Sequence, residues 1–199
     1  MAAVQTKALT EEVDLGDRAV WSVSSAKPGF GVAQLRDDSI HTLWQSEGPQ
    51  PHFIRIEFPK KTAVSRISIF VDVTMDDSYT PCRLSIAVGS FKQDLQVIKL
   101  VELRNPRGWQ DIKLGTEEEA NEKDDDESED EDDESIAIKG HLFQIAVLAN
   151  HLNGKDTHIR AVKIFGPRTY VEHPFPSACT PVHKFYRIIL SFSRVPEHL

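Results

Sequence analysis

The amino-acid sequence predicts an all-β protein that folds as an antiparallel β-sandwich. From residue 52 onward, apolar and polar residues alternate with a period of two, so every second side chain faces the same side of a strand. Residues typical of turns separate these segments, and strong helical periodicity is almost absent from them. Several short strands at such regular spacing are typical of two packed sheets. The predicted strands cover residues 54–58, 67–73, 84–88, 95–103 and 109–114, with turns at 59–61, 75–78, 88–90 and 105–108.

The first part of the chain lacks this alternation. We expect residues 1–16 to form a flexible lead-in, because short terminal segments are poorly ordered unless something holds them. The sandwich domain is predicted to cover residues 17–168. It opens with a short strand at 19–25, in which Trp21 is a candidate core residue, and a turn with one proline and two glycines follows at 27–31.

Residues 35–46 are predicted to form a compact loop that caps its own backbone. Asp37 and Thr42 carry oxygens that can accept or donate hydrogen bonds within such a loop, while Leu35 and Trp44 point inward. A cation site on the same oxygens is the alternative interpretation. Hard cations bind about six or more oxygen ligands, and this segment offers few carboxylates.

One segment interrupts the series of strands. Between Glu117 and Glu134 the chain carries 14 acidic residues and a single lysine, whereas the rest of the chain has a net charge of +5. Residues 115–139 contain almost no apolar side chains, so burial cannot offset the entropy lost on ordering. We therefore expect a disordered acidic insert in a surface loop of an otherwise mildly basic domain.

The strand that follows the insert leads into the chain's most polar loop. Residues 141–150 are apolar on both faces, which predicts a strand at the centre of a sheet. A second apolar segment begins at Ile159, and between the two lies a loop rich in Asn, His, Asp and Thr. Loops at one end of a sandwich commonly carry binding sites, so we expect residues 150–158 to bind a ligand, whose nature the residues alone leave open.

The chain is predicted to end in a tail, residues 169–199, outside the sandwich. Prolines mark its first half as extended. Phe185, Ile188, Ile189 and Phe192 then recur at the spacing of one helix face, with basic residues around them, which predicts a short amphipathic helix. This helix is either a final packing element of the domain or a peptide that docks in a groove of another protein.

Catalytic and metal-binding motifs are absent from the sequence. It contains no phosphate-binding glycine loop, no nucleophile elbow and no zinc-protease motif. His151, Asp156 and His158 could in principle bind a metal, but the pair of loop histidines lacks a convincing third and fourth ligand for zinc. We therefore expect no catalytic residues, no metal and no cofactor, and a binding module rather than an enzyme.

Composition also narrows the location and the partners. The chain has two cysteines and no Cys-x-x-Cys pair, which suits a reducing compartment, and we expect the protein in the nucleus and cytoplasm. No apolar run approaches the roughly 20 residues of a membrane-spanning helix. We therefore expect no membrane partner. Basic residues form no stripe interleaved with aromatics, so we expect no nucleic acid as partner either.

Five contiguous motifs resemble the DOC domain, and the resemblance extends over residues 15–165 apart from the insert. The motifs are WSVSSAKPGFGV at 21–32, QLRDD at 34–38, WQS at 44–46, SYTP at 78–81 and QIAVLANHLNGKDTH at 144–158. The resemblance implies a galactose-binding-like jelly roll, related to discoidin-type and carbohydrate-binding modules. The residues that match the common scaffold of that superfamily are Asp37, Asp38, Thr42, Trp44 and Ser46.

The resemblance also implies a function. DOC-domain proteins are non-catalytic core subunits of the anaphase-promoting complex, a multi-subunit ubiquitin ligase. Beside a propeller-type co-activator, such a subunit acts as co-receptor for the destruction-box degron of substrates, and it promotes processive ubiquitination in cell division and mitotic exit. The alternatives are a discoidin-type carbohydrate-binding module that kept its glycan site, and a scaffold without a ligand site.

Two sets of residues correspond to the family's contact regions. The ligand-facing set is Asn150, His151, Asn153, Gly154, Asp156, Thr157 and His158, with Ser78 and Tyr79 from a neighbouring loop. Family members often end in an Ile-Arg dipeptide that docks on a tetratricopeptide-repeat subunit, whereas this chain runs on to Leu199 without that ending. The corresponding docking set is Phe185, Tyr186, Arg187, Ile188 and Ile189.

Overall fold

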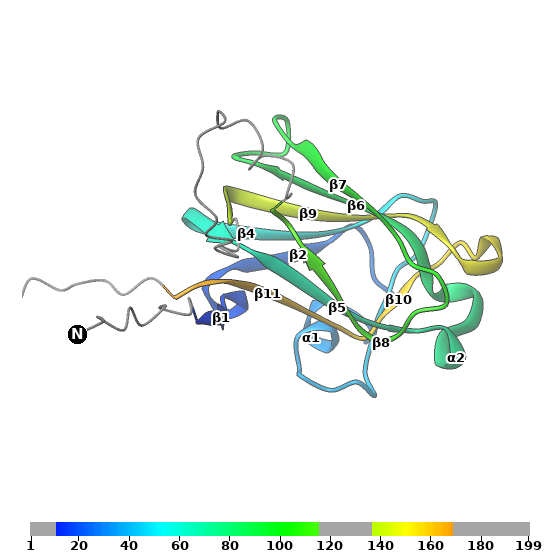
Figure 1. Cartoon of the computed structure of the whole chain (residues 1–199). Coiled ribbons are helices and arrows are strands. Elements are labelled where there is room, and N and C mark those ends of the chain that lie inside the picture. The colour runs from blue at the N-terminus through cyan, green and yellow to red at the C-terminus, as the bar shows by residue number, and fades with distance from the viewer. Residues whose placement is uncertain (1–10, 116–136, 169–199) are drawn as a thin grey trace, which may run out of the picture. The chain divides into compact units, whose positions relative to one another are not determined.

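The computed structural model describes residues 11–115 and 137–168, and it confirms the predicted sandwich (Figure 1). Two antiparallel sheets lie face to face. In order across the sheet, the larger one contains β2 (Val20–Val23), β4 (His52–Val64), β9 (Ile138–Asn150), β6 (Pro81–Gly89) and β7 (Gln96–Glu102). The smaller one contains β1 (Glu12–Asp14), β11 (Ala161–Pro167), β5 (Arg66–Asp72) and β8 (Arg107–Lys113).

Shorter elements join these sheets. β3 (Trp44–Gln45), which precedes β4, and β10 (His158–Ile159), which follows β9, pair as a separate two-stranded ladder. The helical turns are η1 (Gly16–Arg18), α1 (Val32–Leu35), α2 (Val73–Asp76), η2 (Asp77–Tyr79) and η4 (His151–Asn153). None of the helices in the described ranges is long and apolar enough to cross a membrane.

The core fills the space between the sheets with side chains that alternate along the strands. On β9, Phe143, Ile145 and Val147 are fully buried, and Phe143 packs edge-on against Phe58 of β4 at a ring-centroid distance of 5.9 Å. Burying an aromatic or branched side chain of this kind contributes roughly 1.5–3 kcal/mol. Because β9 lies between β4 and β6, its prediction as a central strand is confirmed.

Three predicted turns or loops contain regular structure instead. The turn predicted at 59–61 lies inside β4, where the pairing with β9 shifts register between Glu57 and Thr62. A proline is tolerated there because an irregularity does not need its missing N–H. The turn predicted at 75–78 is α2 followed by η2, and the loop predicted at 35–46 includes the last residue of α1 and all of β3. Short apolar runs do not reveal such elements by periodicity.

Two predicted boundaries are also wrong. The lead-in expected at 1–16 contains β1, which pairs with β11, and Leu15 is only 2% exposed. The predicted end of the insert at residue 139 lies too far along the chain, since Ile138 and Lys139, the first two residues of β9, already pair with β4. In both cases apolar residues beside a polar segment reach the core: Leu15 belongs to it, and Val13 and Ile138 pack against it.

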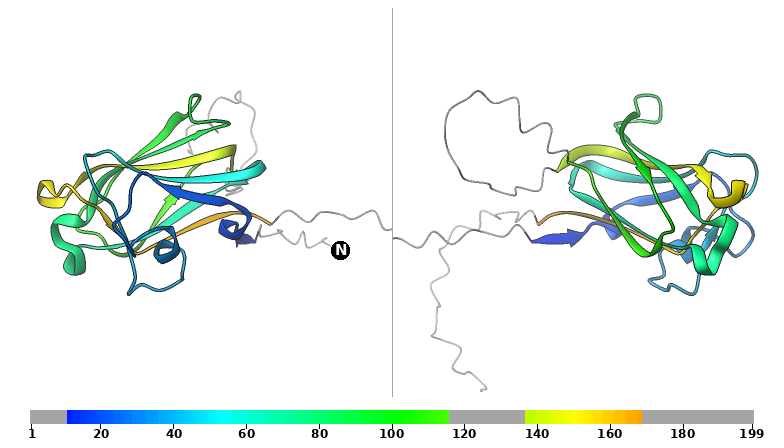
Figure 2. Two further views of the ribbon diagram at one scale, coloured as in Figure 1. Left: turned by 180° about the vertical axis from the view of Figure 1, so that it is seen from behind. Right: turned by 45° about the vertical axis from the view of Figure 1, so that its right-hand side comes forward.

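The connections relevant to function meet at one end of the sandwich. Strand β5 runs into α2 and η2 before β6 begins, and β9 runs into η4 before β10 begins. Figure 2 shows from two sides that α2 and η4 project from the same end. The elements η2 and η4 contact each other there, which brings the two predicted ligand-facing segments together.

Candidate functional site

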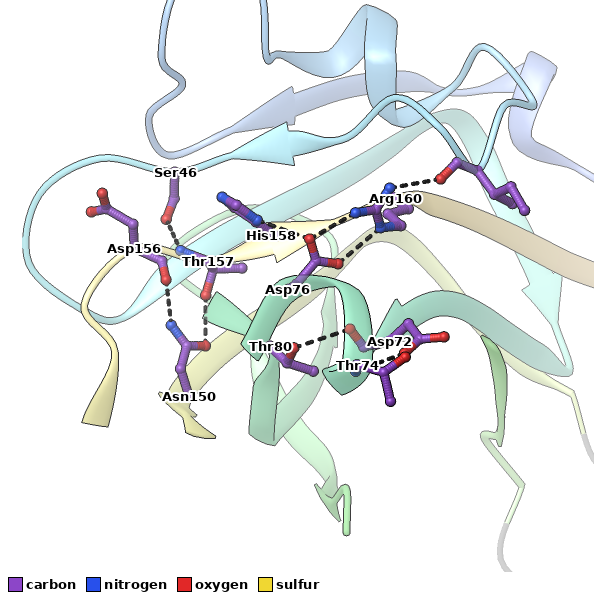
Figure 3. Close-up of polar contacts among 11 residues, drawn as sticks. Ser46, Asp72, Thr74, Asp76, Thr80, Asn150, Asp156, Thr157, His158 and Arg160 are labelled. Carbon is purple, nitrogen blue, oxygen red and sulfur yellow. Dashed lines mark hydrogen bonds and ion pairs between the residues drawn. The ribbon is translucent and has the colours of Figure 1, made fainter. Parts of the chain in front are cut away.

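The loop of residues 150–158 is held from inside by two of its own side chains. The Asn150 amide donates to the carbonyl oxygens of Asp156 at 2.7 Å and Gly154 at 3.2 Å, and its oxygen accepts from the Thr157 hydroxyl at 2.7 Å (Figure 3). Asn150 is 3% exposed and Thr157 is fully buried. Both residues were predicted to face a ligand, but their polar groups are used within the loop, so they shape it.

A second set of bonds fixes the loop to the segment that contains β3. The backbone N–H of Thr157 donates to the Ser46 hydroxyl at 2.8 Å, and the backbone N–H of Ser46 donates to the Thr157 carbonyl at 3.0 Å. The Gln50 amide donates to the Gly154 carbonyl at 3.0 Å. His52 Nε2 lies 2.7 Å from the Lys155 carbonyl, which can only accept, so this nitrogen carries the hydrogen. The loop is therefore anchored on two sides.

Gly154 allows the two ligand-facing segments to touch. A Cβ atom at this position would lie 1.9 Å from the carbonyl oxygen of Ser78, closer than any real contact. Next to it, the backbone N–H of His151 donates to the Thr80 carbonyl at 2.9 Å. Glycine is thus required here for close backbone approach, although its own φ of −58° is ordinary.

His158 and Tyr79 form the second contact between the segments. Their rings stack at a centroid distance of 4.3 Å with 9° between the planes. Tyr79 is 39% exposed, whereas the His158 side chain is 15% exposed. Tyr79 is therefore the more exposed member of the stack beside the polar loop.

A buried ion pair supports the imidazole from behind. Arg160 donates from Nε to Oδ2 of Asp76 and from Nη2 to Oδ1, both at 2.8 Å, and His158 Nδ1 lies 3.1 Å from the same Oδ1 (Figure 3). A further guanidinium nitrogen donates to the Ile40 carbonyl at 2.9 Å. Burial alone would raise the pKa of Asp76, but the hydrogen bonds from His158 and Arg160 and the arginine charge outweigh it and hold that pKa below its ordinary value.

Asp76 and Arg160 are not among the site residues predicted from the sequence. They are 84 positions apart, and nothing local connects them. One signal was present: Arg160 lies inside an apolar segment that enters a buried strand, and a buried arginine needs a counter-ion. That signal predicts a partner carboxylate without identifying it.

The remaining predicted residues form the exposed part of the site. Asn153 is exposed and has a φ of +58°, and it follows Leu152, which has a φ of +50° and is 78% exposed. Asp156 is half-buried and lies 3.3 Å from the Lys27 ammonium group. His151 is also half-buried. The exposed donors and acceptors suit the main chain and polar side chains of an extended peptide.

Within the segment predicted as a loop at 35–46, the self-capping by Asp37 and Thr42 is confirmed. Asp37 Oδ1 accepts from the Ser39 backbone N–H at 2.9 Å and from the Thr42 hydroxyl at 2.7 Å, and the Trp44 indole N–H donates to the Ser25 carbonyl at 2.8 Å. Across residues 11–115 and 137–168, no three side chains of His, Cys, Asp or Glu are grouped as a metal site requires. The predicted docking set from Phe185 to Ile189 lies outside the described residues.

Comparison with known proteins identifies the family. The family model described as "Anaphase-promoting complex, subunit 10 (APC10)" matches residues 1–183. The chain is 43% identical to "Anaphase-promoting complex subunit 10" of Dictyostelium discoideum over 162 residues, which cover 81% of this chain and 77% of that protein. It is 43% identical to the Homo sapiens protein of the same name over 180 residues, which cover 88% of this chain and 87% of that protein.

Solved structures show the same fold. The family 32 carbohydrate-binding module of NanJ from Clostridium perfringens, in complex with galactose, superposes with a TM-score of 0.59. The match covers 78% of this chain and 99% of the module. At 12% identity this likeness shows the fold alone, and it confirms the predicted galactose-binding-like jelly roll. On the strength of the family match and of relatives 43% identical over most of their length, the chain belongs to the family of anaphase-promoting complex subunit 10.

Proposed function

We propose that this chain is a non-catalytic substrate-recognition subunit of the anaphase-promoting complex. Its family supports the place in that ubiquitin ligase, which its relatives carry in their names. In this role it acts beside a propeller-type co-activator as co-receptor for the destruction box, and it promotes processive ubiquitination in cell-cycle progression and mitotic exit. The observation that carries the proposal is the meeting of residues 150–158 with Ser78 and Tyr79 at one end of the sandwich.

The exposed chemistry of this surface suits an extended peptide. Asn153 offers both a donor and an acceptor, Asp156 offers acceptors, and Tyr79 offers a hydroxyl beside an aromatic edge. Each hydrogen bond of this kind contributes about 0.5–1.5 kcal/mol net. The surface alone therefore binds weakly, and a co-receptor gains its effect by binding one end of a peptide whose other end a partner already holds.

The rigidity of the loop supports this role. Asn150 and Thr157 use their side chains to close the loop, and Ser46, Gln50 and His52 tie it to the neighbouring segment. A recognition surface that is already ordered loses less conformational entropy when it binds. Weak contacts can then still contribute to affinity.

Two further parts of the proposal concern partners and location. The basic amphipathic stripe at Phe185, Tyr186, Arg187, Ile188 and Ile189 docks the subunit on a tetratricopeptide-repeat subunit of the complex, and the protein works in the nucleus and cytoplasm. The apolar spacing of the stripe supports the docking. Imaging of a tagged chain tests the location. The docking is tested by affinity purification of the chain with and without residues 181–199, followed by identification of the recovered subunits. Equal recovery of the repeat subunit from both forms would contradict the docking.

The decisive experiment removes three exposed or half-exposed polar groups of the site. Asn153→Ala, Asp156→Ala and His158→Ala together should reduce the number of ubiquitins added per substrate encounter by at least about tenfold, because the second half of a bivalent contact is lost. The measurement is single-encounter ubiquitination of a destruction-box substrate by the complex with co-activator.

The matched control is a triple variant at the other end of β4. Glu57→Ala, Lys60→Ala and Lys61→Ala replace three exposed residues that lie beside the first part of β9, far from the loop after its last residue. Both variants should fold, as circular dichroism will show, and both should enter the complex. Normal processivity in the site variant, or an equal loss in the control, would refute the proposed site.

A further inference from the structure

A carboxylate buried behind the recognition loop contacts both a residue of the proposed binding surface and a buried arginine. Asp76 ends α2, and its side chain is only 3% exposed. Its Oδ1 atom receives both Nη2 of Arg160 at 2.8 Å and Nδ1 of His158 at 3.1 Å (Figure 3). The carboxylate therefore joins the ligand-facing imidazole to a fixed cation.

We propose that Asp76 is a positioning residue that holds His158 in the tautomer with hydrogen on Nδ1, so that Nε2 accepts a hydrogen bond from an N–H group of the peptide ligand. The identity of the ligand as a destruction-box peptide rests on the proposed function. The tautomer does not, because it follows from contacts within this chain.

The hydrogen in the contact between Asp76 and His158 can be assigned from the state of the carboxylate. Arg160 binds the Asp76 carboxylate through two nitrogens, which keeps the carboxylate ionised. An ionised carboxylate can only accept hydrogen bonds. The hydrogen in the contact with His158 must therefore belong to Nδ1, and in the neutral ring this leaves a lone pair on Nε2.

The orientation of the His158 ring is set by two contacts. Tyr79 covers one face of the His158 ring with nearly parallel planes, and the Asp76 contact fixes one edge. Face and edge together define where Nε2 points. The backbone of β10 adds a third constraint, because His158 pairs with Gln45 of β3.

The other ring nitrogen of His158, Nε2, is the atom left to accept a hydrogen bond. This atom is buried, and it has no hydrogen-bond partner within the described part of the chain. A buried acceptor without a partner carries a free-energy cost that an incoming donor removes. Because Nε2 is closed to solvent in the unbound chain, a ligand reaches it only after the side chains around it shift. At that point the site favours a main-chain or amide N–H and disfavours a carboxylate.

The test of the tautomer is a long-range ¹H–¹⁵N correlation spectrum of the full chain at pH 7.5. His158 should show the Nδ1–H form. In Asp76→Leu the carboxylate no longer sets the tautomer, so the signals should move toward the Nε2–H form. Asp76→Leu leaves the buried Arg160 cation without a counter-ion. The second variant therefore combines Asp76→Leu with Arg160→Met, because apolar replacement of a whole buried pair is often tolerated.

The chain offers a matched control for this variant. Arg66→Met with Asp111→Leu makes the same two changes in an ion pair of 2.8 Å between β5 and β8, in the sheet that does not contain β9. It should leave the His158 tautomer unchanged. An Nε2–H form in the unmodified chain, or an unchanged tautomer in both Asp76 variants, would overturn the assignment.

The test of the acceptor is a titration of each full chain with a destruction-box peptide, followed by chemical shifts. The loss of one oriented hydrogen bond should weaken binding of the Asp76 variants by about fivefold to tenfold relative to the unmodified chain and the control. Equal affinity of all forms would refute the role of Nε2. If the unmodified chain does not bind the peptide, the proposed function fails, and the tautomer spectra still decide whether Asp76 positions His158.

Discussion

Gly154→Ala tests whether the recognition surface depends on backbone contact between its two segments. The added Cβ would lie 1.9 Å from the Ser78 carbonyl oxygen, about 1.1 Å short of the 3.0 Å below which Cβ contacts essentially do not occur. The obstacle is backbone, so it cannot rotate away as a flexible side chain would. The two segments must separate by at least that distance.

The cost of this separation can be estimated. Overpacking in a well-packed region destabilises by about 1–3 kcal/mol. The nearby hydrogen bond from His151 to Thr80 and the stack of His158 on Tyr79 cross the same boundary, so both should weaken. We expect a loss of about 2 kcal/mol in the free energy of unfolding, with reduced peptide binding by the surviving fold.

The assay is urea unfolding together with amide chemical shifts of residues 78–80 and 151–158. Gly31→Ala is the matched control, because its Cβ would meet nothing closer than 3.8 Å and its φ is −110°. Gly31 is the N-cap of α1, where alanine is less favourable than glycine, so Gly31→Ala should cost at most about 1 kcal/mol, clearly less than Gly154→Ala. Unaltered stability and unaltered shifts at Tyr79 in Gly154→Ala would show that the segments do not depend on this contact.

Two other predictions follow from the same region. Asn150→Ala should cost about 1–3 kcal/mol in urea unfolding, because it leaves the Thr157 hydroxyl and the Asp156 carbonyl without their partner and removes one of two hydrogen bonds to the Gly154 carbonyl; stability equal to that of the unmodified chain would contradict its structural role. Because the pKa of folded Asp76 lies below its ordinary value of 3.8, the stabilisation from its ionised form is complete above about pH 4 and lost as the pH falls through the folded-state pKa. Urea unfolding between pH 2 and 6 should therefore show a steeper acid loss for the unmodified chain than for Asp76→Leu with Arg160→Met, and parallel curves would refute this.

The apolar patterning of the strands made the sandwich predictable, and the central position of β9 was the clearest case. Residues 141–150 are apolar on both faces, and a strand between β4 and β6 is where such a pattern belongs. The short elements could not be predicted in this way. The ladder of β3 with β10 is two residues long, and α2 is a single turn whose Asp72 cap resembles any other turn residue in sequence.

The sequence predicted where the site lies, but not which of its side chains face solvent. The polarity of residues 150–158 indicated a binding loop, yet polarity alone does not distinguish a side chain that faces a ligand from one that closes the loop. Asn150 and Asn153 are the same residue type three positions apart, and burial separates them: the first is 3% exposed and bonded internally, and the second faces solvent. That difference arises from strand β9, which ends at Asn150 and directs its side chain inward.

The long-range contacts explain why one segment could not be interpreted without the other. Ser78 and Tyr79 follow β5, Gly154 and His158 follow β9, and the two strands belong to different sheets of the sandwich. The two segments meet because β6 begins at Pro81, just after Tyr79, and pairs with the end of β9, where Pro81 lies opposite Asn150. Asp76 and Arg160 then join the segments by a buried ion pair. A buried pair gives little net stability after desolvation, but removing one partner is costly. The pair therefore penalises any arrangement in which the two segments separate, and separation is what a two-part recognition surface has to avoid.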